Sequence, residues 1–231
     1  MDGIRRCDEI LRDAGDDLGV EAHTLYSLAV LESLRGHFDE ARELAERGLS
    51  VFEKTGMVFT VWYALHLGSI ELLAANPEDA EQALRRACED LEAAVDLPSL
   101  TNAASLLAEV RVDQGMLDEA DELSARARDW APKDQPPQHA RWRAARARVL
   151  VRRGAPEAVA LAEEAVALAG KTDFPVLQGD CYLALADVRM IAGVPDARRA
   201  VQQALGCYTQ KGSTVLAARA RALFEATSST P

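Results

Sequence analysis

The sequence predicts an all-α protein, a right-handed superhelix of about five helix pairs closed by a C-terminal capping helix. Hydrophobic residues make up 48% of the 231 residues and are mostly Ala and Leu, while aromatic residues account for only 5%. Ala and Leu lose little rotamer freedom in a helix, so this composition favours helix over strand. Two further observations support the prediction: helix-breaking residues recur at a regular interval, and small side chains occupy fixed positions around each of them.

A helix-breaking residue recurs every 39 or 40 positions along the chain. Each one is followed by an acidic residue and then by an alanine, as in GHFDEA, NPEDA and GMLDEA. The breaker ends one helix, and an acidic first turn complements the positive N-terminus of the next helix. The pattern therefore predicts a repeated helix–turn–helix unit. The breakers are Gly36, Asn76, Gly115, Gly154 and Gly193.

Fifteen small side chains follow one template, three in each repeat. Small residues allow two helix axes to approach closely, because a bulky side chain at the crossing would hold them apart. A single helix pair cannot bury its apolar face, so such pairs stack into a solenoid. The small residues before the breakers are Ala29, Ser69, Ala108, Ala147 and Ala186. Those after the breakers are Ala41, Ala80, Ala120, Ala158 and Ala197, and seven residues later Gly48, Ala87, Ala127, Ala165 and Ala204.

The repeat register places each element in turn. A leading helix over 4–14 is the second half of an incomplete unit, and a helix over 214–226 is the cap. Apolar residues at the helical period, such as Leu25 and Leu28, mark the first helix of a pair. The expected first helices span 21–35, 58–75, 99–114, 138–153 and 177–192. The expected second helices span 38–54, 77–93, 117–130, 156–169 and 195–210.

We expect these elements to form one domain over 1–231. The proline-rich segment 131–137 is the one stretch that resembles a domain boundary, but the repeat register runs straight through it. The repeats lie near 20–56, 57–97, 98–135, 136–174 and 175–212, and the cap covers 213–226.

The segments LYSLAVLESLRGHFDEARELAERGLSVF and LLAEVRVDQGMLDEADELSARA carry a family resemblance. Their pattern of small residue, alanine and small residue resembles the tetratricopeptide repeat (TPR), and it covers nearly the whole chain. The sequence departs from that family in two ways: the period of 39–40 is longer, and Leu replaces most of the large core aromatics.

The last 90 residues resemble something narrower. RWRAARARVLVRRG and YTQKGSTVLAARARALFE are similar to the C-terminal repeat region of large bacterial regulators. Those regulators are multidomain signalling ATPases, some of them fused to class III cyclases or to DNA-binding activator domains. The resemblance implies a fragment or a stand-alone relative of such a protein.

The charge distribution restricts the partners. The net charge is −11, and only residues 136–231 carry a positive balance, with 13 basic and 8 acidic side chains. An acidic body argues against direct nucleic-acid binding, which needs a dense Lys/Arg surface. The sequence contains no apolar stretch of the ~18 residues that a membrane span requires. The polar N-terminus does not resemble a signal peptide, so we expect a cytoplasmic protein.

No catalytic or metal-binding motif stands out. Phosphate-binding patterns such as GxxxxGK[ST] and GxGxxG are absent, as is the GxSxG elbow of hydrolases. The four cysteines and four histidines are scattered, without metal-ligand spacing. We therefore expect a protein that is not an enzyme and has no metal site and no cofactor.

The resemblance to TPR proteins implies a concave groove lined by the first helices. The lining positions lie six and three residues before the small residue of each first helix, and one and four after it. Glu109, Arg148 and Asp187 then form one row of side chains, and we expect ion pairs between them. The expected groove residues are His23, Tyr26, Tyr63, His66, Asn102, Glu109, Arg141, Arg148, Asp180, Asp187 and Met190.

The arginines of segment 141–153 have two interpretations, an anion-binding stripe or an ordinary solvated face. The register pairs Arg152 with Asp113 and leaves Arg141 as the candidate for an incoming carboxylate. The aromatics divide similarly into partner anchors and core residues, and their apolar bulk favours the core. These aromatics are Trp62, Tyr63, Trp130 and Trp142.

The sequence thus predicts a non-catalytic TPR scaffold that binds a protein or peptide, in bacterial signalling or transcriptional regulation. The alternative is a sensor segment of a larger ATPase, cyclase or DNA-binding regulator whose output domain lies elsewhere. A third reading is a homo-oligomer that assembles through the exposed ends of the solenoid.

Overall fold

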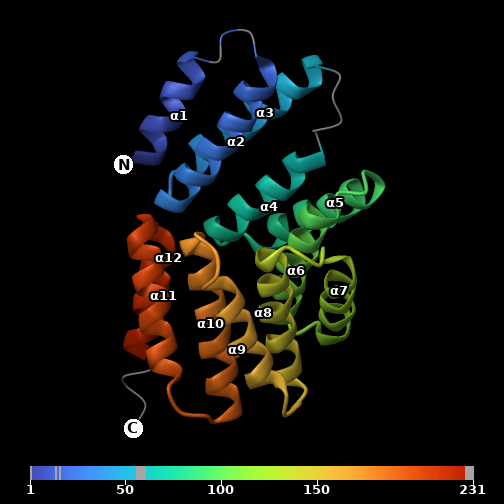
Figure 1. The fold of residues 1–231 in the computed structure, drawn as a ribbon, viewed down its shortest axis with the longest axis vertical. Helices are drawn as coiled ribbons and strands as arrows, with labels where there is room; N and C mark the ends of the chain where they lie inside the picture. Colours follow the sequence, from blue (N-terminus) through green and yellow to red (C-terminus); the bar gives the residue numbers. More distant parts are fainter. Residues whose placement is uncertain (1, 14, 16, 56–60, 227–231) are drawn as a thin grey trace. The chain divides into compact units, whose positions relative to one another are not determined.

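The protein is built from helices joined by short turns, as the computed structural model shows (Figure 1). It describes residues 2–13, 15, 17–55 and 61–226, and these contain twelve helices and no strand. The all-α prediction is confirmed. No helix among the described residues is long and apolar enough to cross a membrane. The chain divides into two compact units, unit 1 up to Asp96 and unit 2 from Leu97.

Unit 1 consists of an incomplete repeat followed by two helix pairs. Helix α2 packs on α3, α4 packs on α5, and the two first helices α2 and α4 lie against each other. Helix α1 packs on α2, which is the place expected for the second half of an incomplete repeat. The helices are α1 (Asp2–Asp13), α2 (Leu18–Arg35), α3 (Phe38–Thr55), α4 (Val61–Ala74) and α5 (Pro77–Ala93).

Unit 2 consists of three helix pairs and a cap. The first helix α8 lies between α6 and α10, and each first helix carries its own second helix; α12 packs on α11. The helices are α6 (Leu97–Asp113), α7 (Leu117–Trp130), α8 (Pro136–Arg152), α9 (Ala158–Ala169), α10 (Pro175–Ala192), α11 (Ala197–Lys211) and α12 (Thr214–Ala226).

The helix bounds lie within three residues of those predicted wherever the structure describes them. Residues 14 and 58–60 of the expected helices lie outside the described residues. The proline-rich segment 131–137 lies inside unit 2, and the division between the units falls at the next repeat boundary towards the N-terminus. The single domain over 1–231 stays a prediction.

The turns explain why glycine recurs at the breakers. Gly36 and Gly193, which follow α2 and α10, have φ angles of 92° and 67°. These lie in the left-handed region, where only glycine avoids a steric penalty. Two non-glycine residues occupy the same region in unit 1, Ala75 with φ 61° and Val95 with φ 58°.

The small residues of the template occupy the helix crossings. Thirteen of the fifteen are buried, and the exceptions are Ser69 and Ala197, which are half-buried. Ala197 is the first residue of α11, so no preceding turn covers it. A Cβ on Gly48 would lie 2.9 Å from the ring of Tyr26, which shows how closely α2 and α3 approach. The template therefore encodes helix contact, as predicted.

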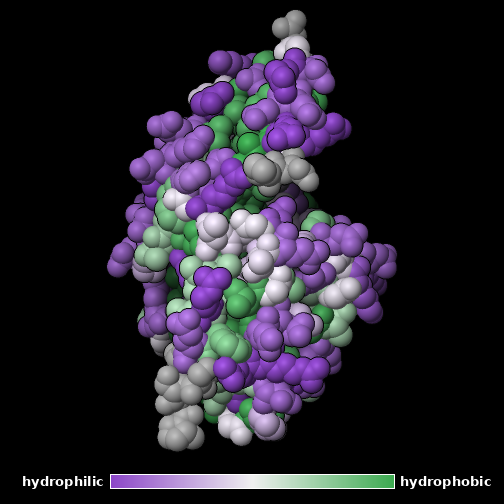
Figure 2. Space-filling view, turned by 90° about the vertical axis from the view of Figure 1, so that its left-hand side faces the viewer, coloured by the Kyte–Doolittle hydropathy of each residue, from purple (hydrophilic) through white to green (hydrophobic). Residues whose placement is uncertain are grey.

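The large aromatic side chains fill gaps between helices. Tyr26, Phe52 and Tyr208 are almost fully buried, and Trp142 is 6% exposed. Trp62 is half-buried, and its Nε1 donates a hydrogen bond to Asp96 Oδ2 at 2.6 Å. On the face that Figure 2 shows, hydrophilic side chains predominate and apolar ones reach the surface in separate patches.

Candidate functional site

The first helices of unit 2 carry a network of charged side chains, which we call the ionic face. At its centre, Arg148 of α8 contacts acids on both neighbouring first helices. Its Nε lies 2.9 Å from Asp187 Oδ2 and its Nη2 lies 2.6 Å from Asp113 Oδ1, while its Nη1 lies 4.0 Å from Glu109 Oε2. The expected row of Glu109, Arg148 and Asp187 is confirmed. The ionic face comprises Glu109, Asp113, Arg141, Arg148, Arg152, Asp180 and Asp187.

Arg152 has a different partner from the one predicted. Its guanidinium binds both oxygens of Asp187, at 2.8 and 3.2 Å, and Arg148 takes Asp113 instead. Helical side chains point back towards the N-terminus, so Arg152 reaches an acid one turn before its own level. The predicted pair of Arg152 with Asp113 was therefore wrong.

Arg141 also faces an acid. Its Nη1 lies 3.8 Å from Asp180 Oδ2, and the Tyr208 hydroxyl donates to the other oxygen of Asp180 at 2.8 Å. The side-chain oxygen of Asn102, at the equivalent position of α6, is buried without a hydrogen-bond partner among the described residues. This end of the ionic face thus offers acceptors beside its one arginine.

The carboxylates of the ionic face differ in protonation. Burial raises the pKa of Glu109 to about 7, against the opposing charge of Arg148, and nearby Asp180 raises it further. Burial also acts on Asp187, but hydrogen bonds from Arg152 and Arg148 hold the pKa of that carboxyl below its usual value. Glu109 and Asp187 share one arginine, but hydrogen bonds to the charged form of Asp187 make its pKa lower than that of Glu109.

The first helices of unit 1 carry aromatic side chains at the expected lining positions six and three residues before the small residue. The rings of Tyr26 and His66 stack with centroids 4.6 Å apart. Tyr26 is only 2% exposed, and within the described part of the chain its buried hydroxyl has no hydrogen-bond partner. Burial lowers the pKa of His66 to about 4, and His23 lowers it further. His66 is therefore neutral near pH 7.

His23 contacts two further aromatic rings. Its ring lies 5.3 Å from that of Phe52 on α3 and 5.1 Å from that of Trp62 on α4. We define the aromatic cluster by these contacts as His23, Tyr26, Phe52, Trp62 and His66.

Sequence reasoning placed the main residues but not all of their neighbours. It missed Tyr208 of α11, whose ring packs on Gly179 and whose hydroxyl holds Asp180. Gly179, a glycine inside a first helix, is the signal that could have pointed to a large partner. Tyr63 lies beside a pocket between α3, α4 and α5, and Met190 is 39% exposed on α10.

The arginine run 141–153 is ion-paired throughout. Each of its six arginines has a carboxylate oxygen within 4.0 Å. Arg146 of α8 contacts Asp121 of α7 at 2.9 Å. Arg153, at the C-terminal end of α8, contacts Asp118 of α7 at 2.6 Å. These pairs do not support an anion-binding stripe.

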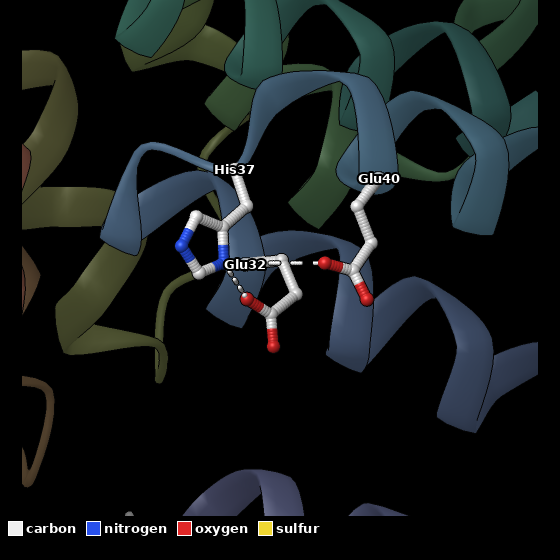
Figure 3. Close-up of side chains that lie close together, drawn as sticks. All are labelled: Glu32, His37 and Glu40. Atoms are coloured by element: carbon white, nitrogen blue, oxygen red, sulfur yellow. Dashed lines mark hydrogen bonds and ion pairs between the residues drawn. The ribbon is translucent and has the colours of Figure 1, made fainter.

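A further polar cluster lies at the turn between α2 and α3 (Figure 3). Ligand atoms of Glu32, His37 and Glu40 lie within 4.8 Å of one another, a spacing that could hold a metal ion. The second helix pair offers a simpler account. In the α4–α5 turn, the Asn76 side chain donates a hydrogen bond to Glu71 at 2.8 Å. In the α2–α3 turn, His37 donates to Glu32 at 2.7 Å. Both pairs are five residues apart and span equivalent turns. The cluster is therefore explained as a brace of the turn.

Comparisons with known proteins identify the fold. No protein-family model matches the chain, and no curated protein matches its sequence. Similar solved structures include the following three. A kinesin light chain with nearly identical TPR-like repeats, from Podosopora anserina, is 20% identical, with a TM-score of 0.53 over 81% of this chain and 95% of its own.

The other two structures cover more of the chain. NprR, solved in complex with its cognate peptide NprX, gives a TM-score of 0.62 at 13% identity, over 96% of this chain and 69% of its own. BtubC from P. vanneervenii gives a TM-score of 0.59 at 15% identity, over 96% of this chain and 88% of its own. The chain has the fold of a TPR-like repeat protein.

Proposed function

We propose that this protein is a non-catalytic scaffold that binds a protein or peptide segment on the first helices of its repeats, within a bacterial cytoplasmic signalling or regulatory system. The ionic face carries the proposal. Its charged side chains are fixed by ion pairs and yet remain accessible, with 15% of the Arg148 side chain, 23% of Asp187 and 28% of Glu109 exposed. Fixed side chains lose little freedom on binding, which favours recognition.

The fold supports the same proposal. NprR is described with its cognate peptide, and its repeat fold extends over 96% of this chain. Repeat arrays offer extended surfaces on which peptides bind. The expected groove residues His23, Tyr63 and His66 would add an aromatic surface. Tyr26 was also expected in the groove, but it is 2% exposed and can act only by supporting the ring of His66.

A second candidate is a sensor segment of a larger ATPase, cyclase or DNA-binding regulator. The resemblance of the last 90 residues to such regulators favours it. A reading frame that continues into one of these domains in the genome would support this candidate.

Site-specific photo-crosslinking tests the scaffold proposal. A photoreactive amino acid in place of Met190 should crosslink a partner in cells, because Met190 lies at an expected groove position and is 39% exposed. The same group at Met116, which is 51% exposed at the start of α7, is the control. Arg148→Met should abolish the Met190 product. Equal products at both positions, or a product that survives Arg148→Met, would contradict the proposal.

A further inference from the structure

Unit 1 contains a pocket of about 650 Å³ between α3, α4 and α5. Its apolar lining includes Leu49 of α3, Ala64 and Leu67 of α4, and Ala83 of α5. A volume of this size is in the range of pockets that hold organic groups. The pocket is separate from the ionic face, which belongs to unit 2.

The polar rim of this pocket has an excess of negative charge. Glu71 is fully engaged, because Arg42 donates to both of its oxygens at 2.6 and 2.8 Å. Arg86 is held by Asp90 at 2.8 Å. Asp79 also lines the rim and is exposed, and within the described residues no ion pair balances its charge. The rim can therefore accept one further cation.

One helix pair of unit 2, α8 with α9, shows what can occupy the equivalent place. Ala64 stands five residues before the small residue of its first helix, and Trp142 holds that position in α8. The Trp142 ring is 6% exposed, and the guanidinium carbon of Arg143 lies 4.2 Å from its centroid. Arg143 in turn contacts Glu164, 3.0 Å away, on the second helix α9.

The second helices correspond in the same way. Arg86 stands six residues after Ala80, and Glu164 six residues after Ala158. The α8–α9 pair thus fills this position with an aromatic ring, a cation over the ring and an acid on the second helix, whereas α6 and α10 have Ala103 and Cys181 there. The α4–α5 pair has Ala64 in place of the ring and Arg86 in place of that acid, and the acids of its rim stand at other positions.

We propose that the pocket of unit 1 binds an aromatic side chain of a partner peptide that carries Lys or Arg next to the ring. The ring occupies the space above Ala64, and the basic side chain pairs with Asp79. Charge complementarity extends beyond the rim, since residues 1–96 contain 21 acidic and 9 basic side chains. An acidic peptide would be repelled by the same groups. This site is independent of the function proposed for the ionic face.

Three short peptides test the proposal by isothermal titration calorimetry with the full chain. The probe is acetylated and amidated Gly-Arg-Trp-Arg-Gly, and its counterparts replace both Arg by Glu or the Trp by Ala. We expect the probe to bind at least about tenfold more tightly than either counterpart, because each lacks one of the two contacts. Absence of saturable binding by the probe, or equal binding of the Glu peptide, would overturn the proposal.

Variants locate the site. Asp79→Lys should weaken binding of the probe by about tenfold, as expected for loss of an ion pair and gain of repulsion. Glu78→Lys is the matched control, since Glu78 is also exposed in the first turn of α5 but does not line the pocket. Ala64→Trp should abolish binding by supplying the ring from the chain itself, with helicity checked by circular dichroism.

The outcomes separate the two proposals. Arg148→Met should leave binding of the probe unchanged, because Arg148 lies on the ionic face. Equal effects of Asp79→Lys and Glu78→Lys would show general charge attraction and overturn the pocket assignment. A loss of probe binding in Arg148→Met would place the peptide on the ionic face and overturn it as well.

Discussion

The two units carry different chemistry where their first helices face one another. In unit 1 the first helices meet through the stacked rings of Tyr26 and His66. In unit 2 they meet through Arg148 and the acids on either side of it. The small residues of the template fix how closely the helices pack, whereas the side chains between them vary without changing the backbone. One scaffold can therefore offer two kinds of surface.

The comparison also shows that the net charge of a unit and the location of its ion pairs are unrelated. Residues 1–96 carry 21 acidic and 9 basic side chains, whereas residues 97–231 carry 16 and 17. The first helix α4 nevertheless contains a single charged residue, Glu71. The ion-paired network between first helices lies in the nearly neutral unit 2. Net charge thus does not predict where charges contact one another.

The largest effect is expected where an anchored ring packs on a helix. Gly179→Ala would place a Cβ inside the contact distance of the Tyr208 ring, which is buried and held by Asp180. We expect a loss of about 2–3 kcal/mol in the free energy of unfolding, measured by urea denaturation.

Gly68→Ala in unit 1 is the counterpart. Its Cβ would lie 2.7 Å from Leu84 Cγ, and an aliphatic side chain can change rotamer. We expect a smaller loss, of about 1–2 kcal/mol. Gly206→Ala in α11 is the control, because no described atom beyond its own helix backbone and chain neighbours lies within 4 Å of that Cβ. It should stabilise by up to about 1 kcal/mol. Equal losses at Gly179 and Gly68 would show that the Tyr208 hydrogen bond does not stiffen the packing.

Arg148→Met tests the ionic face directly. The variant leaves Glu109, Asp113 and Asp187 without their shared arginine, whose side chain is only 15% exposed. We expect a loss of about 1–3 kcal/mol, between the values for exposed and buried ion pairs. Arg86→Met in unit 1 removes a 68% exposed arginine and should leave the melting temperature unchanged. A similar drop in both variants would remove the contrast between the units.

The units should respond to pH in opposite directions. In unit 2, the folded pKa of Glu109 is about 7, above its ordinary value of 4.5. The folded state therefore binds this proton more tightly than the unfolded state does. The stability that protonated Glu109 contributes is complete below pH 4.5 and is lost as pH rises towards 7. Glu109→Gln should therefore stabilise the protein at pH 8 by about 1–2 kcal/mol, reduced for the 28% of the side chain that is exposed.

In unit 1, the folded pKa of His66 is about 4, below its ordinary value of 6.5. Its stability contribution is present above pH 6.5 and is lost as pH falls towards 4. His66→Phe keeps a ring against Tyr26 and removes the titration, so it should stabilise at pH 5 by about 1–2 kcal/mol relative to its effect at pH 8. Thermal melts of both variants at pH 5 and pH 8 measure the two effects. Parallel pH profiles for the two variants would refute the contrast.

The smallest effect concerns the turn that follows α5. Val95 has a φ of 58° and is 74% exposed, whereas Gly193 holds the left-handed position after α10. A β-branched residue is strained there, and little packing is lost on removing it. Val95→Gly should stabilise by about 0.5–1 kcal/mol after the entropy of glycine is subtracted. Gly193→Val is the reverse change in unit 2 and should destabilise. A loss of stability in Val95→Gly would contradict the strain.

The sequence predicted which first-helix positions lie in one row across neighbouring helices, but it predicted the individual partners of side chains less well. The register placed Arg148 between Glu109 and Asp187, because equivalent positions on neighbouring helices lie side by side. It did not give the partner of Arg152, since a long side chain can reach an acid one turn away. Nor did it give the hydrogen bond of His37 to Glu32, because that contact depends on how the turn folds back.

The sequence by itself determined the repeat: the positions of the breakers and of the small residues set where helices end and where they touch. These are local rules of backbone geometry and close approach, so a linear pattern carries them. Only the tertiary structure decided that Tyr26 is buried against His66, that Tyr208 holds Asp180, and that a pocket lies above Ala64. Those features depend on the rotamers and on shifts of a few ångströms between helices distant in the chain, which no local pattern fixes.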